Sequence, residues 1–218
     1  GGCAIGTRPV DLHLFALKKF GAKIKIKDGY IIAEAKKGLR GSIIKFPSIS
    51  VGATENALLA AFNAKGKTVL KNCAVEPEII DLILFLNKLG ANIKISGRTI
   101  SIYENYNKKN EINYKIMFDR IEVGTYMIAG ALVGKRIILN KIKPKIIKKE
   151  IETIKRIGAK IIVKNSSLII SKAKKLKRIN VMTKPYPGFP TDLQAQLMVL
   201  LTQADGISKI KEDIFENR

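Results

Sequence analysis

The chain has 218 residues, of which 46% are hydrophobic, so it is long enough and apolar enough to fold as one large domain or two ordinary ones. No apolar stretch approaches the roughly 18 residues that a membrane span requires, and no signal-peptide pattern is present at the start. We therefore expect a cytoplasmic protein with no membrane partner. The two cysteines, Cys3 and Cys73, lie far apart without metal-ligand spacing, so we expect neither a disulfide framework nor a metal site.

The formal net charge of +22 is the kind of imbalance that often accompanies nucleic-acid binding. The basic residues are spread along the chain, however, and most are lysine, whereas arginine is the better ligand for phosphates and base edges. No RNP, zinc-finger or helix-turn-helix motif accompanies the charge. We therefore do not expect a nucleic-acid partner, and keep a non-catalytic remnant that binds nucleic acid as an alternative function.

The first predicted feature in chain order is a glycine-rich loop with a cysteine, followed by a helix. Gly2 and Gly6 flank Cys3 and allow backbone conformations that other residues avoid. Arg8 and the helix start near Pro9 are neighbours that favour a thiolate and bind anions. Taken alone, a cysteine of no consequence and a solvated Arg8 are equally good interpretations.

An amphipathic helix, a Gly-Ala junction and a hairpin of alternating residues then occur three times, over residues 10–35, 79–102 and 147–171. Gly21, Gly90 and Gly158 each follow the last apolar helical residue, which predicts a left-handed helix end. Asp28-Gly29 and Ser96-Gly97 predict tight hairpin turns.

A second kind of helix, apolar almost all round, is predicted at residues 54–64, 125–133 and 191–202, each followed by a short strand at 67–73, 136–142 and 207–211. A helix that is hydrophobic on every side belongs in the middle of a domain. We therefore predict an α/β fold in which sheets surround buried helices. The polar stretch 105–118 interrupts the repeat, and we predict two domains, 1–116 and 117–218.

Several segments, in order along the chain, form a pattern that is more specific than any one of them. The first is the opening loop, Gly1-Gly2-Cys3-Ala4-Ile5-Gly6-Thr7-Arg8-Pro9-Val10-Asp11-Leu12-His13. The others are Ser50-Val51-Gly52-Ala53-Thr54, Glu76-Pro77-Glu78-Ile79-Ile80-Asp81, Asp119-Arg120-Ile121-Glu122-Val123-Gly124-Thr125, Phe189-Pro190-Thr191-Asp192-Leu193-Gln194-Ala195-Gln196 and Ile214-Phe215-Glu216-Asn217-Arg218. Together they resemble the UDP-N-acetylglucosamine 1-carboxyvinyltransferases of the enolpyruvyl transferase family, and the opening loop is similar almost residue for residue to that family's cysteine loop.

The resemblance implies an inside-out α/β barrel of repeated helix-strand-helix-hairpin units, present here as two incomplete domains: the later part of the cysteine-loop domain and the first part of the second. It implies transfer of the enolpyruvyl group of phosphoenolpyruvate to the 3′-hydroxyl of UDP-N-acetylglucosamine, with release of phosphate, as the first committed step of peptidoglycan synthesis. These two substrates are the expected small-molecule partners. No cofactor is implied, because the chemistry consists of proton transfers and phosphate departure.

In this resemblance Cys3 is the general acid and Asp192 the general base. Asp192 is predicted at the start of a buried helix, the end at which the helix dipole stabilises negative charge. A simple helix-start acid after Thr191 is the alternative interpretation.

The resemblance also implies substrate contacts. Their residues are Arg8, Pro9, Val10, Asp11, Leu12, Ser50, Val51, Gly52 and Ile214. Arg120, Glu122 and Arg218 are implied to organise the substrate cleft, although an ion pair explains Arg120 and Glu122 equally well. Capping of a helix by Ser50 is compatible with its role. We expect His13 to be structural and Cys73 to be a small buried apolar residue.

The chain also departs from the family. Its members are about twice as long, begin with a lysine and asparagine that bind phosphoenolpyruvate, and carry further arginines and an aspartate beyond the region matched here. We therefore expect a fragment that is inactive alone and needs the remaining part of the same polypeptide. The nearest rival, the transferase acting on shikimate 3-phosphate, lacks the Gly-Gly-Cys loop.

Overall fold

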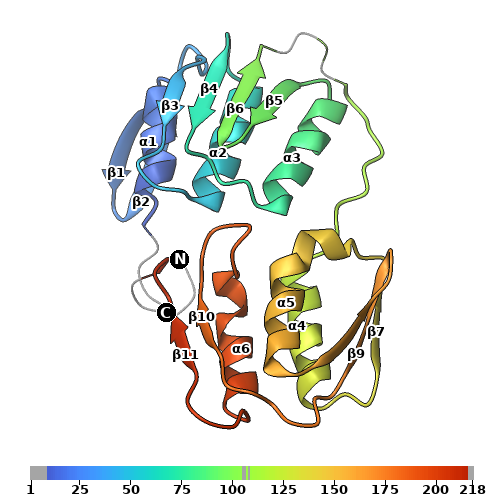
Figure 1. Ribbon diagram of the computed structural model, residues 1–218. Helices are drawn as coiled ribbons and strands as arrows, with labels where there is room; N and C mark the ends of the chain where they lie inside the picture. The colour runs from blue at the N-terminus through green and yellow to red at the C-terminus, as the bar shows by residue number, and fades with distance from the viewer. Residues whose placement is uncertain (1–8, 105–106, 108, 216–218) are drawn as a thin grey trace. The chain divides into compact units, whose positions relative to one another are not determined.

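The computed structural model describes residues 9–104, 107 and 109–215, and the chain divides into two compact units, Gly1–Ile116 and Met117–Arg218. Figure 1 shows that each unit contains helices and strands from a continuous part of the chain. The expectations for Cys3, Arg8 and Arg218 lie outside the described residues.

The first unit packs three helices against a four-stranded sheet, with a separate hairpin beside them (Figure 1). The elements are α1 (Asp11–Lys19), β1 (Lys23–Lys27), β2 (Tyr30–Glu34), β3 (Ile43–Lys45), α2 (Val51–Phe62), β4 (Thr68–Lys71), α3 (Pro77–Lys88), β5 (Asn92–Ser96) and β6 (Thr99–Tyr103). The sheet has the order β3-β4-β6-β5, in which only the β3–β4 pair is parallel. Its core includes Phe20, Phe46, Leu58 and Ile100, all buried.

The second unit repeats this plan with a three-stranded antiparallel sheet in the order β7-β9-β8. The elements are α4 (Arg120–Leu132), β7 (Ile137–Asn140), the 3₁₀ turn η1 (Pro144–Ile147), α5 (Lys148–Ile157), β8 (Lys160–Val163), β9 (Ser167–Ser171), β10 (Asn180–Met182), the 3₁₀ turn η2 (Thr191–Leu193), α6 (Gln194–Leu201) and β11 (Lys209–Lys211). Strands β10 and β11 pair in parallel as a separate sheet. Met127, Ile154, Leu168 and Leu197 are buried in its core.

The predicted glycine helix ends are present in all three repeats. Gly21, Gly90 and Gly158 have φ angles of +93°, +104° and +114°, in the left-handed region that costs glycine no Cβ clash. The alanine after each glycine donates its N–H to a carbonyl five residues back, to Leu17, Leu86 and Ile154. This is the hydrogen-bond pattern of a Schellman helix end, so the local sequence accounts for where these helices stop.

The apolar helices are not enclosed on every side, contrary to our expectation. Helices α2, α4 and α6 each bury one face in the core, but Leu59, Tyr126, Val133, Met198 and Val199 are at least half exposed. Each unit contributes only part of the covering that an apolar helix needs. The described residues therefore leave apolar helix surface uncovered in both units.

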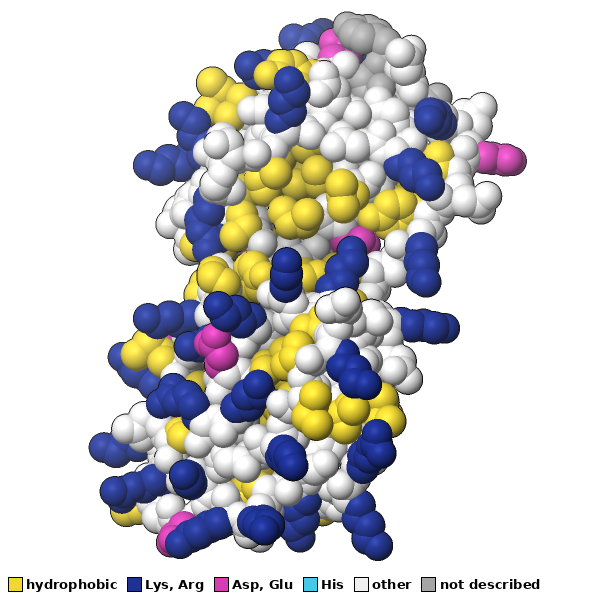
Figure 2. Space-filling view, turned by 45° about the vertical axis from the view of Figure 1, so that its right-hand side comes forward, with side chains coloured by type: hydrophobic (Ala, Val, Ile, Leu, Met, Phe, Trp, Pro, Cys, Tyr) yellow, Lys and Arg dark blue, Asp and Glu magenta, His cyan; other side chains and the backbone are white. Residues whose placement is uncertain are grey.

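Figure 2 shows one face of the molecule, on which Lys and Arg side chains are scattered over both units and apolar side chains form patches among them. Within each unit, the Lys and Arg side chains on this face lie among apolar and uncharged ones. None of the helices in the described part of the chain is both long enough and apolar enough to cross a membrane.

Candidate functional site

The starts of α1 and α2 meet in the first unit. These helices pack against each other, and Leu12 and Val51 both contact the core that they share. Gly52 faces the His13 ring so closely that a Cβ at this glycine would lie 3.1 Å from His13 Nε2. The described parts of the two segments implied above as substrate contacts, Pro9 to Leu12 and Ser50 to Gly52, are therefore neighbours.

Helix α2 is capped as the sequence predicted. Ser50 Oγ accepts a hydrogen bond from Ala53 N at 3.3 Å, and Thr54 N makes the first intrahelical bond, to Ser50 O at 3.1 Å. The N–H groups of Val51 and Gly52 precede that bond and have no partner within the helix. Such N–H groups, together with the helix dipole, favour the binding of a phosphate or carboxylate.

Two side chains beside this helix start were assigned no catalytic role by the sequence. His13 lies half-buried between α1 and α2, and its Nδ1 has no hydrogen-bond partner among the residues that the structure describes. Glu55 is one turn further along α2. Burial, and to a lesser extent the nearby Glu78 carboxylate, raise the pKa of Glu55 above its usual value.

Asp192 lies in the second unit on the 3₁₀ turn η2, which leads directly into α6. The sequence predicted one α-helix over 191–202, whereas the helix begins at Gln194 and is preceded by this tighter turn. Turns of this kind are common at helix starts. The Asp192 side chain is exposed, while Leu193 beside it is fully buried and anchors the turn.

The segments around Gly124 and Asp192 pack closely together. A Cβ at Gly124 would come within 2.3 Å of Leu193 Cδ1, so only glycine admits this packing. One turn further on, Gln196 Nε2 donates a hydrogen bond to Thr125 Oγ1 at 3.1 Å. Helix α4 therefore supports the turn that carries Asp192.

Glu212 is a residue that the sequence reasoning missed. Its Oε2 accepts a hydrogen bond from the Thr191 hydroxyl at 2.7 Å, and its Oε1 accepts the backbone N–H of Ile214 at 2.7 Å. The carboxylate thus joins the turn before Asp192 to the loop that carries Ile214. An acid between Lys211 and Asp213 gives no local signal of such a role.

Arg120 is buried at the start of α4 and forms an ion pair with Glu150 of α5, whose carboxylate is also buried, at 3.7 Å. The interpretation left open for Arg120 and Glu122 was an ion pair, and the partner that the structure gives Arg120 is Glu150 of the neighbouring helix. Asp119 caps the same helix by accepting the N–H groups of Ile121 and Glu122 at 2.7 and 3.1 Å, and Glu122 is exposed.

Cys73 is completely buried, as the sequence predicted. Burial raises the pKa of its thiol to about 12, although a backbone hydrogen bond and Arg98 oppose the shift. At neutral pH this thiol stays protonated and shielded from solvent, so it is a poor nucleophile or metal ligand. Within the described ranges, no group of three or more His, Cys, Asp or Glu side chains is placed to hold a metal ion.

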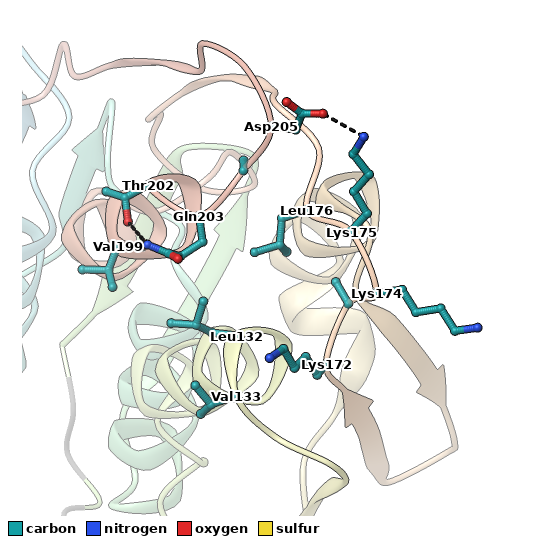
Figure 3. Close-up of a pocket in the computed structure, with 12 residues that line it drawn as sticks. Leu132, Val133, Lys172, Lys174, Lys175, Leu176, Val199, Thr202, Gln203 and Asp205 are labelled. Carbon is teal, nitrogen blue, oxygen red and sulfur yellow. Dashed lines mark hydrogen bonds and ion pairs between the residues drawn. The ribbon is translucent and has the colours of Figure 1, made fainter.

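A pocket of about 730 Å³ lies at the C-terminal ends of α4 and α6, the ends opposite to Asp192. In Figure 3, Leu132 at the end of α4, the next residue Val133, and Val199 of α6 border it, together with the lysine-rich segment after β9. Lys175 forms an ion pair with Asp205 at 2.8 Å. None of the candidate site residues that the structure describes lines this pocket.

Comparison with known proteins decides the family. The family described as EPSP synthase (3-phosphoshikimate 1-carboxyvinyltransferase) matches residues 1–218, the whole chain. The chain belongs to the enolpyruvyl transferase family. Among relatives in this family, the UDP-N-acetylglucosamine 1-carboxyvinyltransferase of Pelagibacter ubique (strain HTCC1062) is 56% identical over all of this chain and 52% of its own length. The protein of the same name from Beijerinckia indica is 48% identical, with 51% of its length covered.

Solved structures of enolpyruvyl transferases share the fold. The enolpyruvyl transferase NikO from Streptomyces tendae superimposes with a TM-score of 0.85 over 97% of this chain and 53% of its own, at 23% sequence identity. An EPSP synthase from Acinetobacter baumannii gives a TM-score of 0.68 at 20% identity, covering 96% of this chain. The expected fold class is confirmed, and the chain spans about half the length of the curated relatives it matches.

Proposed function

We propose that the full-length polypeptide carrying this chain transfers the enolpyruvyl group of phosphoenolpyruvate to the 3′-hydroxyl of UDP-N-acetylglucosamine, and releases phosphate. The observation that carries the proposal is the 56% identity, over every residue of the chain, with a protein named UDP-N-acetylglucosamine 1-carboxyvinyltransferase. The solved structures, at 23% identity or less, support only the fold.

In the proposed reaction, Cys3 gives a proton to the methylene carbon of phosphoenolpyruvate and Asp192 takes the proton of the sugar hydroxyl. The hydroxyl oxygen then bonds to the central carbon, and loss of phosphate and of one methyl proton restores the double bond. The exposed position of Asp192 on η2, with Leu193 buried behind it, suits a base that must reach a substrate. The buried, protonated Cys73 does not compete for the role of Cys3.

The proposed sugar-nucleotide contacts in the first unit are Arg8, Pro9, Val10, Asp11, Leu12, Ser50, Val51 and Gly52. The neighbouring starts of α1 and α2 support this assignment, because both present backbone N–H groups to the region where they meet. In the second unit we assign a substrate contact to Ile214 and an organising role to Arg120, Glu122 and Arg218.

The remaining part of the longer polypeptide is the proposed partner of this chain. The uncovered apolar surface of α2, α4 and α6 supports this, because soluble monomers rarely leave large apolar surface exposed. We expect the 218-residue chain alone to bind an apolar fluorescent dye strongly and the full-length protein to bind it weakly. Equal dye binding by both would contradict the proposed covering.

Turnover is the direct test. The full-length protein should release phosphate from phosphoenolpyruvate only when UDP-N-acetylglucosamine is present, and the 218-residue chain alone should not. Release dependent on shikimate 3-phosphate instead would favour the rival transferase. Robust turnover by the short chain would refute the need for the remaining polypeptide.

The assignment of Cys3 has its own test. Mass spectrometry of the full-length protein after incubation with phosphoenolpyruvate should find an adduct on Cys3, and the Cys73→Ser variant should retain it. An adduct confined to Cys73 would overturn the assignment.

A further inference from the structure

Glu212 follows strand β11 and has its carboxylate surrounded by hydrogen-bond donors. Oε2 accepts from the Thr191 hydroxyl at 2.7 Å, and Oε1 accepts from the backbone N–H groups of Ile214 at 2.7 Å and Phe215 at 3.2 Å. Thr191 is 21 residues earlier in the chain, so this carboxylate makes a long-range link as well as closing its own loop.

The parallel pairing of β10 with β11 places Glu212 at this position. Thr183, just after β10, donates its backbone N–H to Lys211 O at 2.9 Å and its hydroxyl to the same oxygen at 3.5 Å. The hydroxyl also lies close enough to the Glu212 carboxylate to help lower its pKa. Burial by itself raises the pKa of Glu212, but the hydrogen bonds from Thr191, Ile214, Thr183 and Phe215 outweigh it and lower the pKa. The group is therefore an ionised acceptor at neutral pH.

Two candidate substrate residues depend on this link. Thr191 directly precedes Asp192, the proposed base, and Ile214, the proposed substrate contact, has 37% of its surface exposed. Leu193, buried against Gly124 of α4, also anchors the turn. We propose that Glu212 is a positioning residue that sets the Asp192 turn and the Ile214 loop in one geometry; this rests on the proposed function.

The chemistry of the link calls for a carboxylate. Glu212 offers acceptor oxygens on both sides, whereas glutamine has one oxygen and one NH₂ group. In a Glu212→Gln variant, the NH₂ must face either the Thr191 hydroxyl or the backbone N–H groups of Ile214 and Phe215. Facing the backbone N–H groups, the NH₂ group loses both of their bonds; facing Thr191, it can only donate, so the hydroxyl must turn to accept and the charge-assisted bond is lost. Either way the link is weakened with little change in side-chain size.

The test uses the full-length protein and a double-mutant cycle between Glu212→Gln and Asp192→Asn. Glu212→Gln should lower kcat by about ten- to a hundredfold, the range for a small misplacement of a reacting group. In the Asp192→Asn background the same substitution should lower the residual kcat by less than about threefold, because the base that Glu212 positions is gone. Equal losses in both backgrounds would overturn the proposal.

The Ile214 arm of the link has a separate readout. Glu212→Gln should also weaken UDP-N-acetylglucosamine binding, measured by calorimetry, both in the otherwise wild-type protein and in the Asp192→Asn background. The Thr191→Val variant removes the hydroxyl that bonds to Glu212 and leaves the Glu212 bonds to Ile214 and Phe215 in place, so it should lower kcat and leave the dissociation constant unchanged. A Thr191→Val variant that alters binding but not kcat would contradict this division of roles. If Glu212→Gln fails to fold, the Thr191→Val variant provides the test of the link.

Asp213→Asn is the matched control. This neighbouring acid is exposed and its carboxylate pairs with Lys211 at 3.1 Å, so its removal should leave kcat and binding unchanged. A loss like that of Glu212→Gln would show that any charge change in the loop has the same effect, and would overturn the assignment.

Failure of the proposed function is distinguishable from failure of the link. A wild-type full-length protein without turnover on either pair of substrates refutes the proposed function. Hydrogen exchange of the Ile214 and Phe215 amides still tests the link, because both should exchange faster in Glu212→Gln than in wild type and Asp213→Asn. Unchanged exchange would refute the link whatever the reaction.

Discussion

The two units share one repeat but hold their candidate residues by different means. In the first unit the candidates lie at the starts of two helices. Gly52 has no Cβ, so the His13 ring packs closely against it; a Cβ at this position would lie 3.1 Å from His13 Nε2. In the second unit the candidates are side chains on a turn and a loop, joined by the Glu212 carboxylate through hydrogen bonds of 2.7 Å on both sides. The first arrangement depends on the missing Cβ of Gly52, and the second depends on the charged carboxylate of Glu212.

Two glutamates show the physical side of this difference. Burial dominates at Glu55 in the first unit, where Glu78 adds repulsion and the pKa rises. Hydrogen bonds dominate at Glu212 in the second unit and the pKa falls. A partly buried carboxylate is therefore stabilised as an anion only where donors have been arranged around it.

The largest expected effect is that of Asp192→Asn in the full-length protein. Removal of a general base typically lowers the rate by about 10²- to 10⁴-fold, and we expect a loss in kcat of that size with the dissociation constant of UDP-N-acetylglucosamine changed far less. Steady-state kinetics and calorimetry measure the two. A variant that loses binding but keeps kcat would move Asp192 from catalysis to substrate binding.

Gly124→Ala should destabilise the second unit by about 1–3 kcal/mol, because the new Cβ would lie 2.3 Å from the buried Leu193 side chain. Gly130→Ala is the matched control on the same helix, since its Cβ would meet Ile170 at the milder distance of 3.1 Å. Thermal unfolding of the full-length variants should show a lower midpoint for Gly124→Ala than for Gly130→Ala. Equal unfolding midpoints would show that the η2 turn shifts at little cost to make room for the added Cβ.

Gly52→Ala should weaken UDP-N-acetylglucosamine binding by about tenfold, the equivalent of roughly 1.4 kcal/mol, because the methyl group pushes His13 and the two helix starts apart. Calorimetry on the full-length protein measures the change. Adding His13→Ala removes the ring that the methyl group meets and should restore most of the affinity. If the double variant does not regain affinity, the loss in Gly52→Ala comes from a change in the α2 backbone and not from the contact with His13.

The smallest effect is expected for Glu55→Gln. Because the pKa of Glu55 is raised in the folded state, its contribution to stability is complete below the unfolded pKa and is lost as the pH rises through the folded pKa. Thermal unfolding should therefore show the variant more stable than wild type at about pH 7.5 and no different at about pH 4. Glu152→Gln, at an exposed pair with Lys148, should show no such gain at either pH. A pH-independent gain for Glu55→Gln would rule out titration as the cause.

Local sequence patterns predicted the parts of the fold that depend on local geometry. The helix positions follow from apolar spacing, and the ends at Gly21, Gly90 and Gly158 follow from a backbone conformation that glycine adopts most easily. The short strands β3 and β10 were missed, because three residues carry too little alternation to indicate a strand. Their parallel partners lie far along the chain.

The sequence by itself determined the repeat, the α/β class and, through its motifs, the family and the candidate residues Asp192, Ser50, Val51 and Gly52. Only the tertiary structure decided what surrounds them: His13 against Gly52, Leu193 against Gly124, Arg120 with Glu150, and Thr191 with Glu212. The physical reason is that each of these contacts joins residues from different elements. Their distances depend on how the helices and strands pack, and neither partner changes the local periodicity that a sequence pattern reveals.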